Sequence, residues 1–216
     1  MQLYALLGFS GAMGSTDVTH IPWVMCPYTQ ARSYTGKEGF PTIAYQVTVD
    51  HTRRALAVTS GFTRSTNDRT IIRFDIAVTQ IRTDPTYMEQ TNKLYKADGT
   101  PYEQKGCYLL VDNGYDKCTT LISPSKYPGD QDDLVFSKRV ESARKDVECY
   151  FGIVKGRFRI CKLPVPYRKK EDIDAIFFTC CILHNMLHSS TTWATCTRSP
   201  TGQGAQACTT HGSTRP

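Results

Sequence analysis

Apolar residues recur every three or four positions between residues 137 and 160, the clearest helical pattern in the chain. This spacing predicts an amphipathic helix with one face packed on a core, formed by Val140, Ala143, Val147, Phe151, Val154 and Phe158. A second row beside that stripe has the same spacing and carries Arg144, Glu148, Gly152, Lys155 and Arg159. Glu148 therefore lies among basic neighbours. A surface carboxylate in helix-stabilising ion pairs and a functional carboxylate both fit this position.

Strand patterns precede this helix. Residues 43–50 alternate apolar and other side chains, and the β-rich residues 55–60 follow after a short charged turn, so the two segments predict a hairpin. The run 108–111 is continuously apolar and ends in Asp112-Asn113-Gly114. A buried strand that finishes in a tight turn would place the Asp112 carboxylate at the end of a sheet.

The remaining segments complete the order of elements. Residues 61–68 are turn-like, and residues 69–80 fit both helical and strand spacing, of which we favour the helix. Residues 172–188 are apolar on nearly every side, which predicts a buried core helix. Residues 189–216 are rich in Ser, Thr and Gly, and we expect them to be disordered. The pattern favours an α/β domain over residues 1–188, with helices packed on a mixed sheet.

Composition narrows the class of protein. The chain has 216 residues, 40% of them hydrophobic and 21% charged, which is typical of a globular domain. It lacks the roughly 18 consecutive apolar residues of a membrane span and the basic start of a secretory signal, so we expect an intracellular protein without a membrane partner. The nine cysteines include no Cys-x-x-Cys pair, which favours buried free thiols over disulfides or zinc.

Positive charge is concentrated rather than spread. The net charge is +6, and residues 155–170 contain seven Lys and Arg residues and no acid. A run of this kind is usually a solvated face. Its position directly after Glu148 makes a surface that follows a phosphate backbone the competing interpretation.

Three acidic residues stand in distinctive local sequences. Asp17 lies in GSTDVTHI, Asp112 in YLLVDNGY and Glu148 in VECYFG. Two carboxylates on strands and a third on a later helix can hold divalent metal at a phosphodiester, as a nuclease or strand-transfer enzyme requires.

These segments also resemble a known family. The chain is similar to the nuclease domain of PIF/Harbinger-type transposases, which are DDE-superfamily endonucleases. The resemblance extends over about residues 8–188 and is carried by residues 11–21, 61–68, 110–115, 147–158 and 180–186. It implies a ribonuclease-H-like fold, a mixed sheet flanked by helices.

The resemblance assigns roles to individual residues. It implies that Asp17, Asp112 and Glu148 are the catalytic and metal-binding triad, with two Mg²⁺ or Mn²⁺ ions as cofactors. Asp68 matches an acid of the family, and we favour a structural or outer-sphere role for it. His20 is a further supporting candidate, with core packing as the alternative. A family motif also includes His184 and Asn185, for which we favour structural support.

DNA is the partner that the resemblance implies. Arg144, Lys155, Arg157 and Arg159 are the candidates for contacts with DNA phosphates, which position DNA without reading its sequence. Family members carry an N-terminal helical DNA-binding region, whereas Asp17 lies close to Met1 here. We therefore expect a separate Myb-like DNA-binding protein as a partner, leave oligomerisation open, and expect the nucleus, shared with the cytoplasm as the alternative.

Three functions remain to be separated. The first is a DDE-type DNA endonuclease, and the second is an inactive transposase relic that acts as a DNA- or chromatin-associated binding protein. The third is an unrelated ribonuclease-H-like enzyme that cuts RNA. Metal binding separates the first two, and a comparison of DNA and RNA substrates separates the third.

Overall fold

The computed structural model describes residues 2–196 with the exception of residues 65, 67, 97, 116 and 117. One sheet contains β1 (Ala12–Pro22), β2 (Thr42–Val49), β3 (Ala55–Val58), β4 (Phe62–Thr63), β7 (Tyr108–Leu110) and β8 (Leu121–Ile122), and a separate ribbon pairs β5 (Thr91–Tyr95) with β6 (Pro101–Lys105). The helices are α1 (Gln2–Leu6), α2 (Tyr28–Tyr34), α3 (Asp68–Ile71), α4 (Ile76–Thr83), α5 (Pro85–Met88), α6 (Gln131–Arg157) and α7 (Lys170–Cys196), with short 3-10 turns η1 (Ile72–Phe74) and η2 (Arg159–Cys161).

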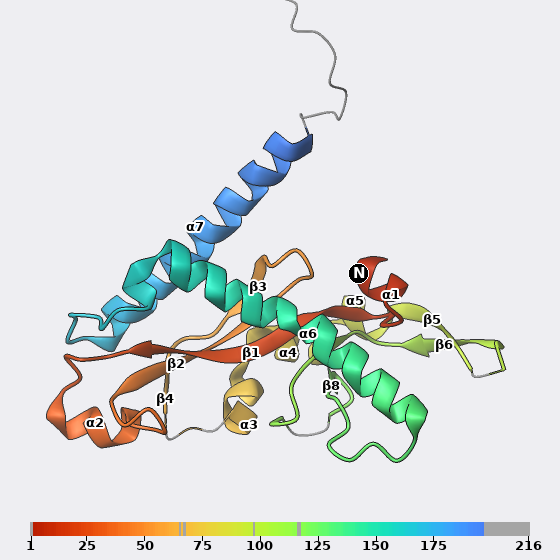
Figure 1. Cartoon of the computed structure of the whole chain (residues 1–216), viewed down its shortest axis with the longest axis horizontal. Helices are drawn as coiled ribbons and strands as arrows, with labels where there is room; N and C mark the ends of the chain where they lie inside the picture. The colour runs from red at the N-terminus through yellow and green to blue at the C-terminus, as the bar shows by residue number, and fades with distance from the viewer. Residues whose placement is uncertain (1, 65, 67, 97, 116–117, 197–216) are drawn as a thin grey trace, which may run out of the picture.

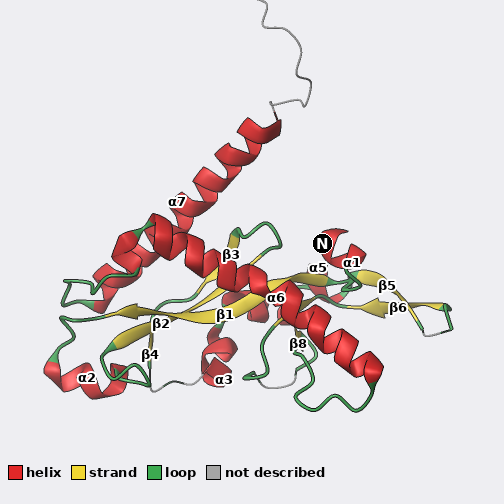
Figure 2. Ribbon diagram, viewed as in Figure 1, coloured by secondary structure: helices red, strands yellow, loops and turns green. Residues whose placement is uncertain are grey.

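The strand order of the main sheet is β3-β2-β1-β7-β8, with β4 also paired to β2. The hairpin strands are antiparallel, whereas β7 is parallel to β1 and β8 is parallel to β7. The sheet is therefore mixed and flanked by helices, as the sequence predicts (Figure 2).

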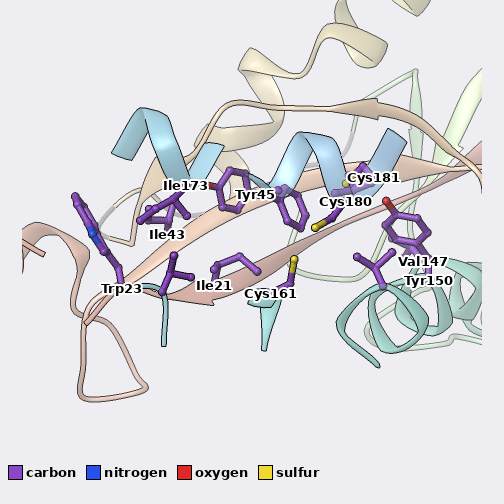
Figure 3. Packing of buried hydrophobic residues seen from close by; sticks show 14 of the residues in the cluster. Ile21, Trp23, Ile43, Tyr45, Val147, Tyr150, Cys161, Ile173, Cys180 and Cys181 are labelled. Atoms are coloured by element: carbon purple, nitrogen blue, oxygen red, sulfur yellow. The ribbon is translucent and has the colours of Figure 1, made fainter. Parts of the chain in front are cut away.

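The two faces of the sheet are covered by different helices. Alternate residues of β1 and β2, among them Ile21 and Val47, pack against α6 and α7 in the largest core cluster. Figure 3 shows part of this cluster, in which Cys161, Cys180 and Cys181 fill space among aromatic and aliphatic side chains. On the opposite face, α4 packs against β7 and contributes Val78 and Ile81 to a second cluster.

The helix α6 confirms the amphipathic pattern. Its core-facing residues Val140, Ala143, Val147 and Val154 are buried, and it crosses the sheet beside β1 (Figure 1). It begins earlier than predicted because Asp130 caps it, its side chain accepting a hydrogen bond from the Asp133 N–H at 2.8 Å. The predicted hairpin is also confirmed, and the segment 69–80 is helical but is interrupted at Asp75, which caps α4.

The prediction of a helix buried on all sides is wrong for α7. Ile173, Phe177 and Cys181 lie in the core, whereas Ile182 and Met186 are 59% and 61% exposed. Figure 1 shows this half of α7 extending away from the sheet, in agreement with the exposure of those side chains. It also continues past the predicted end at His188 to Cys196, because no Gly or Pro interrupts that stretch. Of the predicted tail, residues 197–216 lie outside the described residues.

Candidate active site

Asp17 lies in the middle of β1, on the face that α6 covers. It shares this face with Ile21, whose side chain packs against α6 residues, because both positions have the same parity along the strand. One carboxylate oxygen, Oδ1, accepts a hydrogen bond from the Val18 N–H at 2.8 Å. The side chain is 26% exposed. Asp17 is thus anchored by the central strand and still reaches solvent.

Asp112 follows the end of β7 and lies at the level of Asp17. Ser15 of β1 is paired with Leu110 of β7, and the two acids come two residues later on these parallel strands. Leu110 packs against Val140 of α6, so this parity of β7 faces the same helix. The Gly114 N–H donates to Asp112 Oδ1 in the turn that the sequence predicts. Asp17 on β1 and Asp112 just beyond the end of β7 are therefore level with each other along the two strands.

Glu148 lies on α6, on the surface turned towards β1. The link is Arg144, one helical turn earlier, whose guanidinium nitrogen Nη1 lies 2.9 Å from Glu148 Oε1 and 4.0 Å from Asp17 Oδ2. Because both oxygens approach the same nitrogen, they are within about 7 Å of each other, where like charges repel measurably. The structure therefore brings two predicted triad members to one cation.

The donor set is suited to a hard divalent cation. Carboxylate oxygens are the ligands that Mg²⁺ and Mn²⁺ prefer. In this structure the positive charge near Asp17 and Glu148 is the Arg144 guanidinium. Within the described part of the chain, however, no three His, Cys, Asp or Glu side chains are gathered closely enough to hold a metal. Asp112 thus lies on the adjacent strand but is not joined to the pair in this arrangement.

Of the two supporting candidates, His20 lies away from this pair. His20 is an odd number of residues from Asp17, so its side chain belongs to the opposite face of the sheet. Its backbone carbonyl accepts a hydrogen bond from Lys155 Nζ at 3.0 Å. Asp68 begins α3, and its side chain lies outside the described residues.

The predicted phosphate contacts divide into two partly buried residues, Arg144 and Lys155, and two exposed residues, Arg157 and Arg159. Lys155 packs towards β1, and burial lowers its pKa below the ordinary value for a lysine. Arg157 Nη1 lies 3.4 Å from the His184 Nδ1, between α6 and α7. Arg159 of η2 is exposed. Lys155 is thus partly buried against β1, Arg157 and Arg159 are exposed, and Arg144 lies between Asp17 and Glu148.

His184 and Asn185 clamp the hairpin to α7, in keeping with the structural role that we favoured. The His184 Nε2 lies 2.9 Å from the Arg53 carbonyl, and burial lowers the pKa of this imidazole, so the ring is neutral and donates there. The Asn185 amide accepts from the Ala55 N–H and donates to the Ala55 carbonyl, both at 2.9 Å. The clamp holds the end of the hairpin that pairs with the β1 half containing Asp17.

Two residues that the sequence analysis did not single out also support this site. A Cβ on Gly14 would lie 2.2 Å from the Val49 carbonyl oxygen, so β1 and β2 can approach only because this residue is glycine. On the opposite face, Asp75 is 1% exposed and accepts a hydrogen bond from Gln46 Nε2 at 2.8 Å. Its position just before a helix was the available signal, because Asp is a preferred N-cap.

These features define a mixed α/β protein in which Asp17 of the central strand and Glu148 of a long covering helix approach one arginine. The chain matches the family described as "Plant transposon protein" over residues 1–192, and it belongs to that family. This membership agrees with the resemblance to Harbinger-type transposases.

Two curated relatives share low sequence identity with the chain. The chain is 24% identical over 185 residues to "Protein ALP1-like" of Arabidopsis thaliana, which covers 83% of this chain and 44% of that protein. It is 22% identical over 207 residues to "Putative nuclease HARBI1" of Rattus norvegicus, which covers 94% of this chain and 54% of that protein. The chain thus spans about half the length of these relatives. The comparison with solved structures gave no match.

Among the described residues, none of the helices combines the length and the hydrophobicity that crossing a membrane requires.

Proposed function

We propose that this chain is a transposase-derived, metal-dependent DNA endonuclease in which Asp17, Asp112 and Glu148 form the catalytic triad. The observation that carries the proposal is the register between β1 and β7, which sets Asp17 level with Asp112, together with Arg144, which joins Asp17 to Glu148. The family and the name of the rat relative support a nuclease. In the strand order β3-β2-β1-β7-β8, the first two pairs are antiparallel and the last two pairs are parallel. This arrangement supports a ribonuclease-H-like sheet.

The triad would hold two Mg²⁺ or Mn²⁺ ions, which activate the attacking hydroxyl and stabilise charge on the leaving oxygen. The residues of the chain supply the framework. Asp17 is fixed by the central strand, and Asp112 by its turn with Gly114. Glu148 is carried by α6, where it is 47% exposed and free to change rotamer. A change of the Glu148 rotamer can therefore move its carboxylate towards the two acids of the sheet.

The approach of DNA is supported by open space on α6. A Cβ at Gly152 or Gly156 would meet no atom within 4 Å, so these positions, one and two turns beyond Glu148, present bare backbone. Arg159 is exposed in η2, which follows α6, and we propose it as a phosphate contact. The partner, a Myb-like protein, and residence in the nucleus are proposals that follow from a DNA substrate.

The test is nicking of supercoiled plasmid in Mn²⁺ by the wild type, Glu148→Gln and Glu103→Gln. Glu103 is an exposed glutamate on β6, in the separate two-stranded ribbon, so its variant loses the same charge away from the site. Because even outer-sphere partners of metal ligands contribute roughly 10- to 100-fold, we expect Glu148→Gln to lower the nicking rate at least about a hundredfold. Equal rates for the two variants would contradict the proposal.

Two further outcomes separate the alternatives. If the protein cuts RNA in preference to a matched DNA, the substrate is RNA and the proposed DNA endonuclease is wrong. Binding to DNA without nicking by any of the proteins, at any Mn²⁺ concentration, would instead favour a DNA-binding relic. The guanidinium of Arg144 between the acids is the observation that agrees with this second function, since it already balances one of the two negative charges without metal.

A further inference from the structure

Arg144 occupies an unusual place for a residue on the basic side of α6. Its side chain is only 20% exposed, and its Nη1 approaches carboxylate oxygens from two different elements, Glu148 of α6 and Asp17 of β1. Its Nε is buried and has no hydrogen-bond partner in the described structure. The guanidinium is therefore held at this position by the two carboxylates.

Two carboxylates at this separation favour a cation between them. A guanidinium satisfies that need with one positive charge and fixed N–H directions. A divalent cation would satisfy it with twice the charge and direct bonds to oxygen. Both cannot lie within contact distance of the same two oxygens, because their charges repel and their volumes overlap.

Resting on the proposed nuclease function, we propose that Arg144 is an internal counter-cation that competes with the divalent metal for Asp17 and Glu148. Metal enters as the guanidinium withdraws. The metal-free protein thereby balances one of the two negative charges of its acid pair, and the site is gated by the concentration of free divalent cation. Arg144 is in this account a positioning residue that acts through the two carboxylates.

The proposal also predicts the sequence in which Arg144 contacts first the two carboxylates and then DNA. A guanidinium that bridges Asp17 and Glu148 cannot bind a DNA phosphate at the same time. Once metal has displaced it, the side chain can turn from the carboxylates to the phosphate backbone. By linkage, metal then strengthens DNA binding through Arg144, and DNA strengthens metal binding to the same extent.

The test measures metal binding directly, without activity. Free Mn²⁺ is titrated by electron paramagnetic resonance in the presence of the wild type, Arg144→Gln, Arg144→Lys and Lys145→Gln. Lys145 is exposed and adjacent on α6, so its variant changes the net charge identically and controls for general electrostatics. Thermal unfolding of each protein without metal checks that all are folded.

We expect Arg144→Gln to lower the dissociation constant for Mn²⁺ about fivefold, a value typical of releasing a partly exposed ion pair. Lys145→Gln should change it less than about twofold, because the exposed charge of Lys145 is screened by solvent and salt. Arg144→Lys should lie near the wild type, since an ammonium keeps the competing charge. Equal dissociation constants for Arg144→Gln and Lys145→Gln, or weaker binding by Arg144→Gln, would overturn the competition.

Failure of the proposed nuclease function would give a different result from failure of the competition alone. If Mn²⁺ binds to no variant, or if Glu148→Gln leaves the dissociation constant of the wild type unchanged, the acids do not form a metal site. The nuclease proposal then falls, and the competition falls with it. If the wild type binds Mn²⁺ through Glu148 and only the effect of Arg144 is missing, the nuclease proposal stands and the competition alone is refuted.

Discussion

The Asn185 side chain joins α7 to the first residue of β3 through both backbone groups of Ala55. Substitution by alanine removes a hydrogen bond from the Ala55 N–H and another to its carbonyl, each 2.9 Å long. A typical intramolecular hydrogen bond contributes about 1 kcal/mol, and partly buried partners that lose their bonds add a desolvation cost. We therefore expect Asn185→Ala to lower the free energy of unfolding by about 2–3 kcal/mol.

The assay is urea unfolding followed by far-ultraviolet circular dichroism, with linear extrapolation to water. Gln80→Ala is the control, because it removes an exposed amide from helix α4, and we expect it to change stability by less than about 0.5 kcal/mol. If Asn185→Ala unfolds at the same urea concentration as Gln80→Ala, the clamp contributes nothing. The assignment of the His184-Asn185 motif to structural support would then be refuted.

Three further predictions follow from the same structure. Burial lowers the pKa of His184, so the unfolded state takes up the proton first. The free energy of unfolding should therefore fall as pH drops below about 6.5, and urea unfolding at pH 7.5 and 5.5 should show a smaller fall in His184→Gln. Gly14→Ala should lower the free energy of unfolding by at least about 2 kcal/mol, because the new Cβ meets the Val49 carbonyl. Gly152→Ala, in open space on α6, should raise it by up to about 1 kcal/mol. Equal melting temperatures for the two variants would contradict this reasoning. Arg159→Glu should weaken DNA binding at low salt, with a loss that shrinks as salt rises, and an affinity that is insensitive to salt would remove this residue from the DNA surface.

Local patterns were sufficient where one side of an element is buried. The stripe of Val140, Val147 and Val154 identified α6, and the alternation of residues 43–50 identified β2, because the core imposes those periods on the sequence. The ribbon of β5 and β6 was missed because every residue of β6 is exposed, which leaves no alternation to detect. Its strands are joined by backbone pairing instead.

The site was harder to foresee than the fold, because it depends on distances between elements. The sequence predicted that Asp17, Asp112 and Glu148 would act together, and the structure brings Asp17 of β1 and Glu148 of α6 to the same Arg144 guanidinium. Arg144 shares its ridge with other basic residues, and nothing in that spacing reveals that its guanidinium turns inwards. The same holds for Lys155, whose contact with the His20 carbonyl depends on how closely α6 approaches β1.

Asp112 offers the most direct test of the catalytic proposal, because only its position on the adjacent strand connects it with Asp17. Asp112→Asn removes the charge and keeps an oxygen that can accept from the Gly114 N–H, so the turn is preserved. Asp132→Asn, at an exposed site in α6, is the matched control. We predict that Mn²⁺-dependent nicking by Asp112→Asn falls at least about a hundredfold with an unchanged melting temperature, while the control nicks like the wild type. Nicking by a folded Asp112→Asn at the rate of the control would contradict a three-carboxylate site.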